Sequence, residues 1–106
     1  MKIYISGKIG GLEYNEAFVL FSEAEAEARR VFGKVSSVVE VINPMKKVSE
    51  TLDWTWCEYL REDIKILCDC AGIYMLNNWR DSKGASLELD VAKALGLAVV
   101  YQDGGK

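Results

Sequence analysis

Hydrophobic residues follow two different patterns, which alternate along the chain. Short runs rich in β-branched and aromatic residues predict strands at residues 2–6, 35–43, 72–77 and 97–101. Apolar positions three to four residues apart predict helices at residues 14–32, 53–68 and 82–96. Because the strands alternate with helices and are apolar on both faces, they favour a parallel sheet with helices on both sides. The predicted fold class is α/β.

Residues at the ends of these segments support the assignment. Gly33 is a natural stop for the first helix, Pro44 closes the second strand, and Asp53 is a plausible N-cap of the second helix. In a sheet of this kind, ligands bind beyond the carboxyl ends of the strands. Three loops are expected at that edge, with the sequences "GKIGG", "PMKK" and "NWRDSKG".

Glu88 interrupts the apolar face of the last predicted helix. The residues that share its face by helical spacing are Ala85, Val91, Ala92 and Leu95. A capping box would need Ser or Thr three positions earlier, where Ala85 stands. Two interpretations stay open, a structural acid that favours the helix dipole and a functional carboxylate.

Asp63 is placed in the same way on the helix before it. Trp56, Leu60 and Leu67 share its face. An ion pair with a nearby Lys or Arg is the structural alternative. Two carboxylates in a partly apolar pocket would instead acquire different pKa values, so that one acts as a nucleophile and the other as an acid.

Composition narrows the possible functions. The 106 residues suffice for one domain, residues 1–106, and half of them are hydrophobic. A net charge of −3 gives no broad attraction for a nucleic-acid polymer. The start of the chain has no leader-like apolar segment, and no segment has the length of a membrane span. We expect a cytoplasmic protein with three reduced cysteines, without a metal or other cofactor, because histidine is absent.

The predicted loops offer places for an anion and a base. "SGKIGG" is neither a Walker motif nor a dinucleotide-binding fingerprint, but it exposes backbone N–H groups beside Lys8. Ser82, Lys83 and Gly84 enter a helix N-terminus and form a second candidate anion site. Taken alone, a loop of either kind is more often a plain turn than an anion site.

Tryptophan and asparagine residues near the same edge are further candidates. Trp79 follows the third strand, where its indole face is suited to stacking on a base, and Asn77 stands two positions earlier. Trp54 and Trp56 are expected to pack in the core, as large aromatic side chains commonly do.

Taken together, the segments resemble the nucleoside 2-deoxyribosyltransferase-like family. The matching pieces are "IYISGKIGG", "VINP", "WCEYLREDIKILCDCAGIYML" and "NWRDSKGASLELDVAKALGLAVVY". They resemble most a small bacterial and phage branch related to the hydrolases of 2′-deoxynucleoside 5′-phosphates. The resemblance implies a flavodoxin-like three-layer sandwich with a parallel sheet of four to five strands.

The resemblance also implies roles for individual residues. Glu88 matches the nucleophile that attacks the anomeric carbon, Asp63 the acid that assists the departing base, and Tyr4 the aromatic residue of the first strand. Positions that hold a 5′-phosphate in the related hydrolases match Gly7, Lys8, Ile9, Gly10, Ser82 and Gly84. Asn77 and Trp79 complete the predicted substrate-binding set.

The leading hypothesis is cleavage or transfer at the N-glycosidic bond of a 2′-deoxynucleoside or its 5′-monophosphate. Lys8, Lys83 and Arg80 favour the phosphorylated substrate. The alternatives are a non-catalytic nucleotide-binding or sensing module and a flavodoxin-like interaction domain. The family implies a homo-oligomer, here a dimer, in which a neighbour completes each site from a segment after the last strand. Only "QDGGK" follows Tyr101, so that contribution is not expected in this chain.

Overall fold

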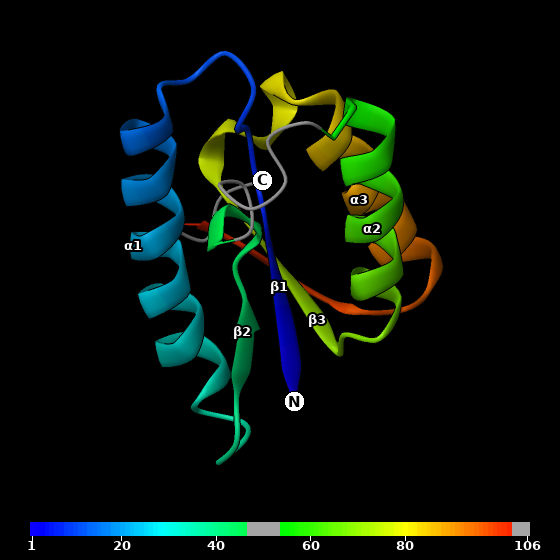
Figure 1. Cartoon of the computed structure of the whole chain (residues 1–106). Coiled ribbons are helices and arrows are strands. Elements are labelled where there is room, and N and C mark those ends of the chain that lie inside the picture. Colours follow the sequence, from blue (N-terminus) through cyan, green and yellow to red (C-terminus); the bar gives the residue numbers. More distant parts are fainter. Residues whose placement is uncertain (47–53, 103–106) are drawn as a thin grey trace.

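The computed structural model describes residues 1–46 and 54–102, in which four strands form one parallel sheet. The strand order is β2-β1-β3-β4, so β1 and β3 are the two central strands (Figure 1). The strands are β1 (Lys2–Ser6), β2 (Glu40–Ile42), β3 (Gly72–Met75) and β4 (Ala98–Tyr101). Tyr4 pairs with Ile42 on one side and with Ile73 on the other, which fixes the register of β1.

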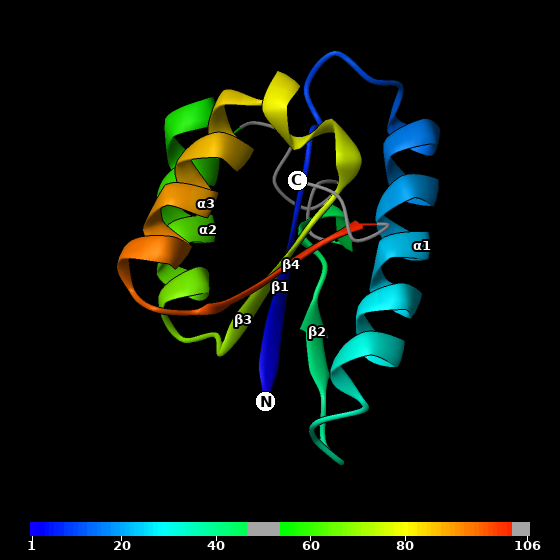
Figure 2. The ribbon, with the colours of Figure 1, turned by 180° about the vertical axis from the view of Figure 1, so that it is seen from behind.

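Helices cover both faces of this sheet. They are α1 (Tyr14–Phe32), α2 (Trp56–Cys68) and α3 (Lys83–Ala94), with a short 3-10 helix η2 (Asn77–Asp81) before α3. Figures 1 and 2 show α1 on one side of the strands and α2 with α3 on the other. The predicted α/β fold of the flavodoxin-like type, with three layers and at least four parallel strands, is confirmed. None of the described helices is both long and apolar enough to cross a bilayer.

Alternation along β1 divides the core into two clusters. Ile3 and Ile5 pack with Phe21 of α1, whereas Tyr4 lies in the cluster on the side of α2 and α3. Successive side chains of a strand point to opposite faces, so Ser6 shares the face of Tyr4. One face of β1 therefore supplies only packing, and the other presents two hydroxyl groups toward α3.

Several predicted boundaries differ from those in the structure. The predicted strand at 35–43 is reduced to β2, because the chain leaves α1 in turns in which the N–H of Ser36 donates to the Phe32 carbonyl oxygen. Val35 and Val38 are strongly exposed and lie outside β2, although β-branched residues are common in strands. The second helix begins at Trp56, and its N-cap is Thr55, whose Oγ1 accepts the N–H of Glu58 at 3.3 Å.

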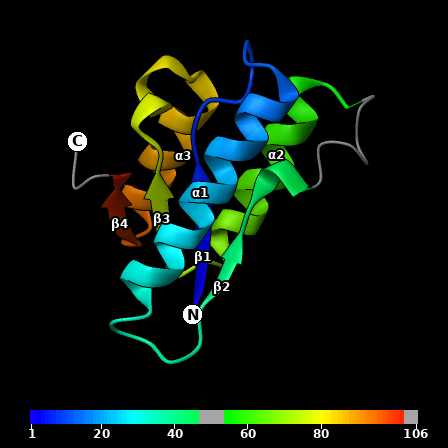
Figure 3. The ribbon, with the colours of Figure 1, turned by 90° about the vertical axis from the view of Figure 1, so that its left-hand side faces the viewer.

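The expected N-cap Asp53 lies outside the described residues. Within the described ones, the predicted helix over 14–32 is confirmed at both ends by α1. The predicted strand over 72–77 ends earlier, at Met75, because Asn77 already belongs to η2. The loop after β1, η2 and the beginning of α2 gather at the carboxyl end of the sheet (Figure 3).

Candidate active site

Glu88 is buried at the carboxyl end of β1 and is only 5% exposed. Its two carboxylate oxygens have different donors. The Ser6 hydroxyl donates to Oε1 at 2.6 Å, and the Tyr4 hydroxyl donates to Oε2 at 3.1 Å. Glu88 therefore lies on the face of α3 that packs toward β1, as its position on the apolar helix face predicted, and it accepts hydrogen bonds from two hydroxyl groups of that strand.

Glu88 lies too far from the beginning of α3 to cap this helix. Ser82 is the N-cap, and its Oγ accepts the N–H of Ala85 at 3.1 Å. The first turn of α3 contains no acidic residue, and the influence of a helix dipole decreases within that turn. The dipole interpretation therefore does not explain why Glu88 is buried.

Burial dominates the electrostatics of this carboxyl group. It raises the pKa of Glu88 from 4.5 to about 7, and the negative charge of Asp63 acts in the same direction. The hydrogen bonds from Ser6 and Tyr4 oppose this shift, because they stabilise the ionised form. Near neutral pH, Glu88 therefore exchanges readily between the acid and the carboxylate.

Asp63 approaches the same place from α2. Burial raises the pKa of Tyr4 well above its usual value, and the charges of Glu88 and Asp63 raise it further. Asp63 is also a hydrogen-bond partner of the Tyr4 side chain. The two acids, predicted on separate helices from helical spacing alone, thus converge on one phenol.

These polar groups open into a cavity of about 380 Å³. Tyr4, Ser6, Asp63 and Glu88 all line it. The loop after β1 and the start of α3 form two further walls, which include Gly7, Ile9, Gly10, Ser82, Gly84 and Ala85. The volume is in the range of pockets that hold small molecules.

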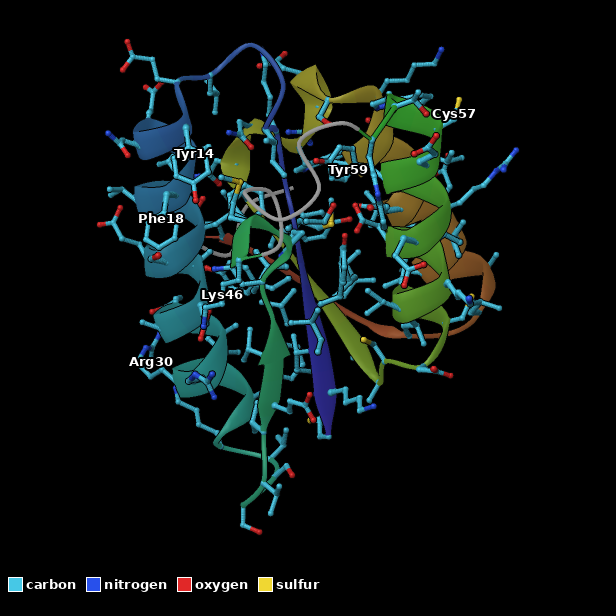
Figure 4. All side chains as sticks on the ribbon, viewed as in Figure 1. Tyr14, Phe18, Arg30, Lys46, Cys57 and Tyr59 are labelled. Atoms are coloured by element: carbon cyan, nitrogen blue, oxygen red, sulfur yellow. The ribbon has the colours of Figure 1, made fainter. Side chains whose placement is uncertain are left out.

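The remaining wall is aromatic and was predicted differently. Trp54, Trp56 and Tyr59, here called the aromatic wall, line the cavity from the beginning of α2. Trp54 is 38% exposed and Trp56 is 50% exposed, so the expectation that both indoles pack in the core is wrong. Figure 4 shows Tyr59 directed from α2 toward the middle of the molecule, whereas Cys57 points outward.

Trp79 occupies a different place from the one predicted. Its ring packs against the cluster beneath α3 and lies 6.2 Å from the Tyr101 ring, centroid to centroid. The Arg80 guanidinium covers it at 4.7 Å, and neither residue is part of the cavity lining. The structure therefore places Trp79 outside this cavity, and its stacking on a base stays a prediction. Asn77 is also outside the lining, and its N–H donates to Gln102 Oε1 at 2.9 Å.

The loop after β1 lines the cavity with Gly7, Ile9 and Gly10 and not with the charged side chain of Lys8. The N–H of Lys8 donates to Asn78 Oδ1 at 2.9 Å. A Cβ on Gly7 would lie 2.8 Å from Leu76 Cβ, so only glycine permits this close approach. Lys83 is likewise not part of the lining, and its Nζ lies 5.6 Å from the centre of the Trp56 ring.

Sequence reasoning missed Ser6 as a site residue, although a signal was present. Tyr4 was a candidate, and a residue two positions further along the same strand shares its face. In the aromatic wall, Trp56 and Tyr59 stand seven and four positions before Asp63 and so share its helix face, whereas Trp54 precedes the helix and had no comparable signal.

The fold and the site define an α/β protein with a carboxylate-containing cavity at the carboxyl end of a parallel sheet. Residues 1–101 match the family described as "Domain of unknown function (DUF4406)", and the chain belongs to this family. No curated protein sequence matches the chain.

Among solved structures, the chain is similar to the 2-desoxiribosyltransferase from Leishmania mexicana. The sequence identity is 18% and the TM-score is 0.60. The match covers 94% of this chain and 62% of that enzyme, so this chain spans less than two thirds of its relative's length. The likeness shows a shared fold, and at that level it confirms the resemblance inferred from the sequence.

Proposed function

We propose that this protein cleaves the N-glycosidic bond of a 2′-deoxynucleoside or of its 5′-monophosphate, with Glu88 as the nucleophile. The observation that carries the proposal is the buried Glu88 carboxylate, held by two hydroxyl donors in a cavity that it shares with a second acid. A charge is costly to bury, so its presence on an otherwise apolar helix face calls for a functional reason. The name of the similar enzyme, a 2-desoxiribosyltransferase, agrees with this chemistry.

In the first step, a Glu88 oxygen forms a bond to the anomeric carbon of the sugar while the bond from that carbon to the base nitrogen breaks. The electron pair of the broken bond leaves with the base. In the reactive state the two acids hold one proton between them, so that Glu88 is ionised and Asp63 carries the proton that it donates to the departing base. Dividing the displacement in this way is the strategy of retaining glycosidases.

In the second step, the glycosyl ester on Glu88 is attacked by water or by a second base. Asp63, now ionised, accepts the proton from the attacking water, and the Glu88 carboxylate is released unchanged. Water gives hydrolysis, and a second base gives transfer.

Tyr4 is a hydrogen-bond donor throughout this cycle. Its raised pKa keeps the phenol protonated at neutral pH, so the hydroxyl keeps a proton for Glu88. We assign it the task of holding the carboxylate while the charge of Glu88 changes.

The cavity walls suggest how a substrate lies. The base would stack on the aromatic wall, because an indole face binds any planar ring. A 5′-phosphate would lie between the backbone of the loop after β1 and the start of α3, where Ser82 and Gly84 line the cavity. The Lys83 ammonium, which lies over the Trp56 ring at the start of α3, adds positive charge near this wall.

The test is incubation with a panel of 2′-deoxynucleosides and their 5′-monophosphates, followed by chromatography of the free bases. The wild-type protein is expected to release base, Glu88→Gln to release none, and Asp90→Asn to match the wild type. Asp90 is an exposed acid on the same helix and serves as the control. Binding of a ligand without any base release would identify the alternative, a nucleotide-binding module.

A further inference from the structure

The shortest hydrogen bond to Glu88 comes from a residue to which no role has been assigned. Ser6 Oγ lies 2.6 Å from Glu88 Oε1, closer than Tyr4 lies to Oε2. A hydroxyl group has one proton to donate, and in Ser6 that proton is used for Glu88. Hydrogen bonds of this length to a carboxylate are among the strong ones in proteins.

The backbone holds Ser6 rigidly in this position. It is the last residue of β1, is paired with Met75 of β3, and its carbonyl oxygen accepts the N–H of Leu76 at 2.8 Å. The close approach of Gly7 to Leu76 fixes the chain directly after it. Ser6 is 1% exposed.

The groups that face Glu88 come from two elements, β1 and α2. Tyr4 and Ser6 of β1 donate to it, Asp63 of α2 repels its negative charge, and burial disfavours its ionised form. Of the two donors, Ser6 lowers the pKa of Glu88 more than Tyr4 does. The Tyr4 hydroxyl has one proton, and Asp63 is a second partner of that hydroxyl besides Glu88.

We infer that Ser6 is a positioning residue, whose hydroxyl orients the Glu88 carboxylate through Oε1 and keeps it ionised for attack. This inference rests on the proposed nucleophilic role of Glu88 and extends it. Ser6 touches neither the sugar nor the base in this account, and it acts through Glu88 alone. Both carboxylate oxygens thus have a hydroxyl donor, Oε1 from Ser6 and Oε2 from Tyr4.

The test compares Ser6→Ala and Ser6→Cys with the wild type, using Ser86→Ala as the matched control. Ser86 is a serine of α3 whose hydroxyl donates to the carbonyl oxygen of Trp79 at 3.4 Å, away from Glu88. The first readout is the titration of the Glu88 carboxyl by carbon-13 NMR, with the signal assigned from Glu88→Gln. The second is the pH dependence of kcat and KM for base release. Circular dichroism confirms that each variant is folded.

Ser6→Ala is expected to raise the pKa of Glu88 and to lower kcat at pH 7 by about ten- to a hundredfold. KM should stay within about twofold, and alkaline pH should restore part of kcat, because the carboxyl ionises again. Ser6→Cys should fall between, since a thiol is a weaker donor. Ser86→Ala should match the wild type in both readouts.

Two outcomes separate this inference from the proposed function. An unchanged Glu88 titration in Ser6→Ala, with a pH profile like that of Ser86→Ala, would overturn the positioning role and leave the nucleophile in place. A wild-type protein that releases no base, but whose Glu88 pKa still rises in Ser6→Ala, would support the effect of Ser6 on Glu88 and refute the proposed reaction.

Discussion

The Tyr4 hydroxyl donates to Glu88 Oε2 across 3.1 Å, although the two residues are 84 positions apart in the sequence. Tyr4 is on the central strand β1, and Glu88 is on a helix that packs against that strand. The contact joins the first strand to the last helix, in the part of the cavity wall that also contains Ser6 and Asp63. The properties of this pair lead to predictions about stability as well as chemistry.

The buried acid should make stability fall as the pH rises. The pKa of Glu88 is about 7 in the folded protein and about 4.5 when unfolded, so between these values the folded state binds more protons. The free energy of unfolding should therefore decrease from pH 5 to pH 8, relative to Glu88→Gln, by on the order of 3 kcal/mol. Urea denaturation of both proteins across this range measures the difference. Parallel curves would show that Glu88 does not titrate with a raised pKa.

Asp63→Asn should slow the release of the base without preventing attack by Glu88. Loss of a positioned acid costs typically about 10²- to 10⁴-fold in rate. The loss should be smaller for a nucleoside whose base leaves readily without a proton. Single-turnover rates for good and poor leaving groups measure this, with Asp90→Asn as the control. An equal loss for both leaving groups would contradict the role of Asp63 as the proton donor.

The aromatic wall should matter for binding and little for stability. In a Glu88→Gln background, which does not consume the substrate, Trp56→Leu should weaken binding of a deoxynucleoside by about 1–3 kcal/mol. Because Trp56 is half exposed, the free energy of unfolding should change little. Trp79→Leu should show the reverse, a loss of stability on the order of 2 kcal/mol with unchanged affinity. Calorimetry for binding and urea denaturation for stability decide between the two patterns.

The periodicity of the sequence was sufficient to place both acids, because helical spacing identifies residues that share a face. It also put Trp56 on the helix face of Asp63, but it could not show that Trp54 lines the cavity. That depends on where α2 begins relative to the sheet, and Trp54 precedes the helix. Trp79 lies outside the cavity for a related reason. It does follow β3, but η2 turns its ring toward Tyr101.

Strand boundaries were predictable only where burial agreed with residue type. Residues 2–6 were predicted as a strand and form β1, whose last four residues are all buried. Val35 and Val38 have the same β-branched character but are exposed, and they lie outside β2. β-Propensity measures how well a side chain fits a half-buried pleated surface, and the sequence alone does not show where that surface lies.

Two glycines of the loop after β1 should differ sharply in tolerance to a methyl group. Gly7→Ala would place Cβ 2.8 Å from Leu76 Cβ and should cost about 1–3 kcal/mol of stability, as other overpacked sites do. Around Gly10 no heavy atom of the described residues lies within 4 Å of such a Cβ, so Gly10→Ala should leave stability unchanged or raise it slightly. Thermal denaturation of the two variants tests this pair. Similar melting temperatures would contradict the close approach at Gly7.

The central claim is that Glu88 forms a covalent bond to the sugar. The most direct measurement is mass spectrometry of peptides from protein that is quenched with acid during turnover of a 2′-deoxynucleoside or its 5′-monophosphate. The account predicts one 2-deoxyribosyl group, with its phosphate when present, on the peptide that contains Glu88. It also predicts that Glu88→Gln carries no adduct and releases no base. Base release by Glu88→Gln at the wild-type rate, or an adduct on another residue, would contradict the account.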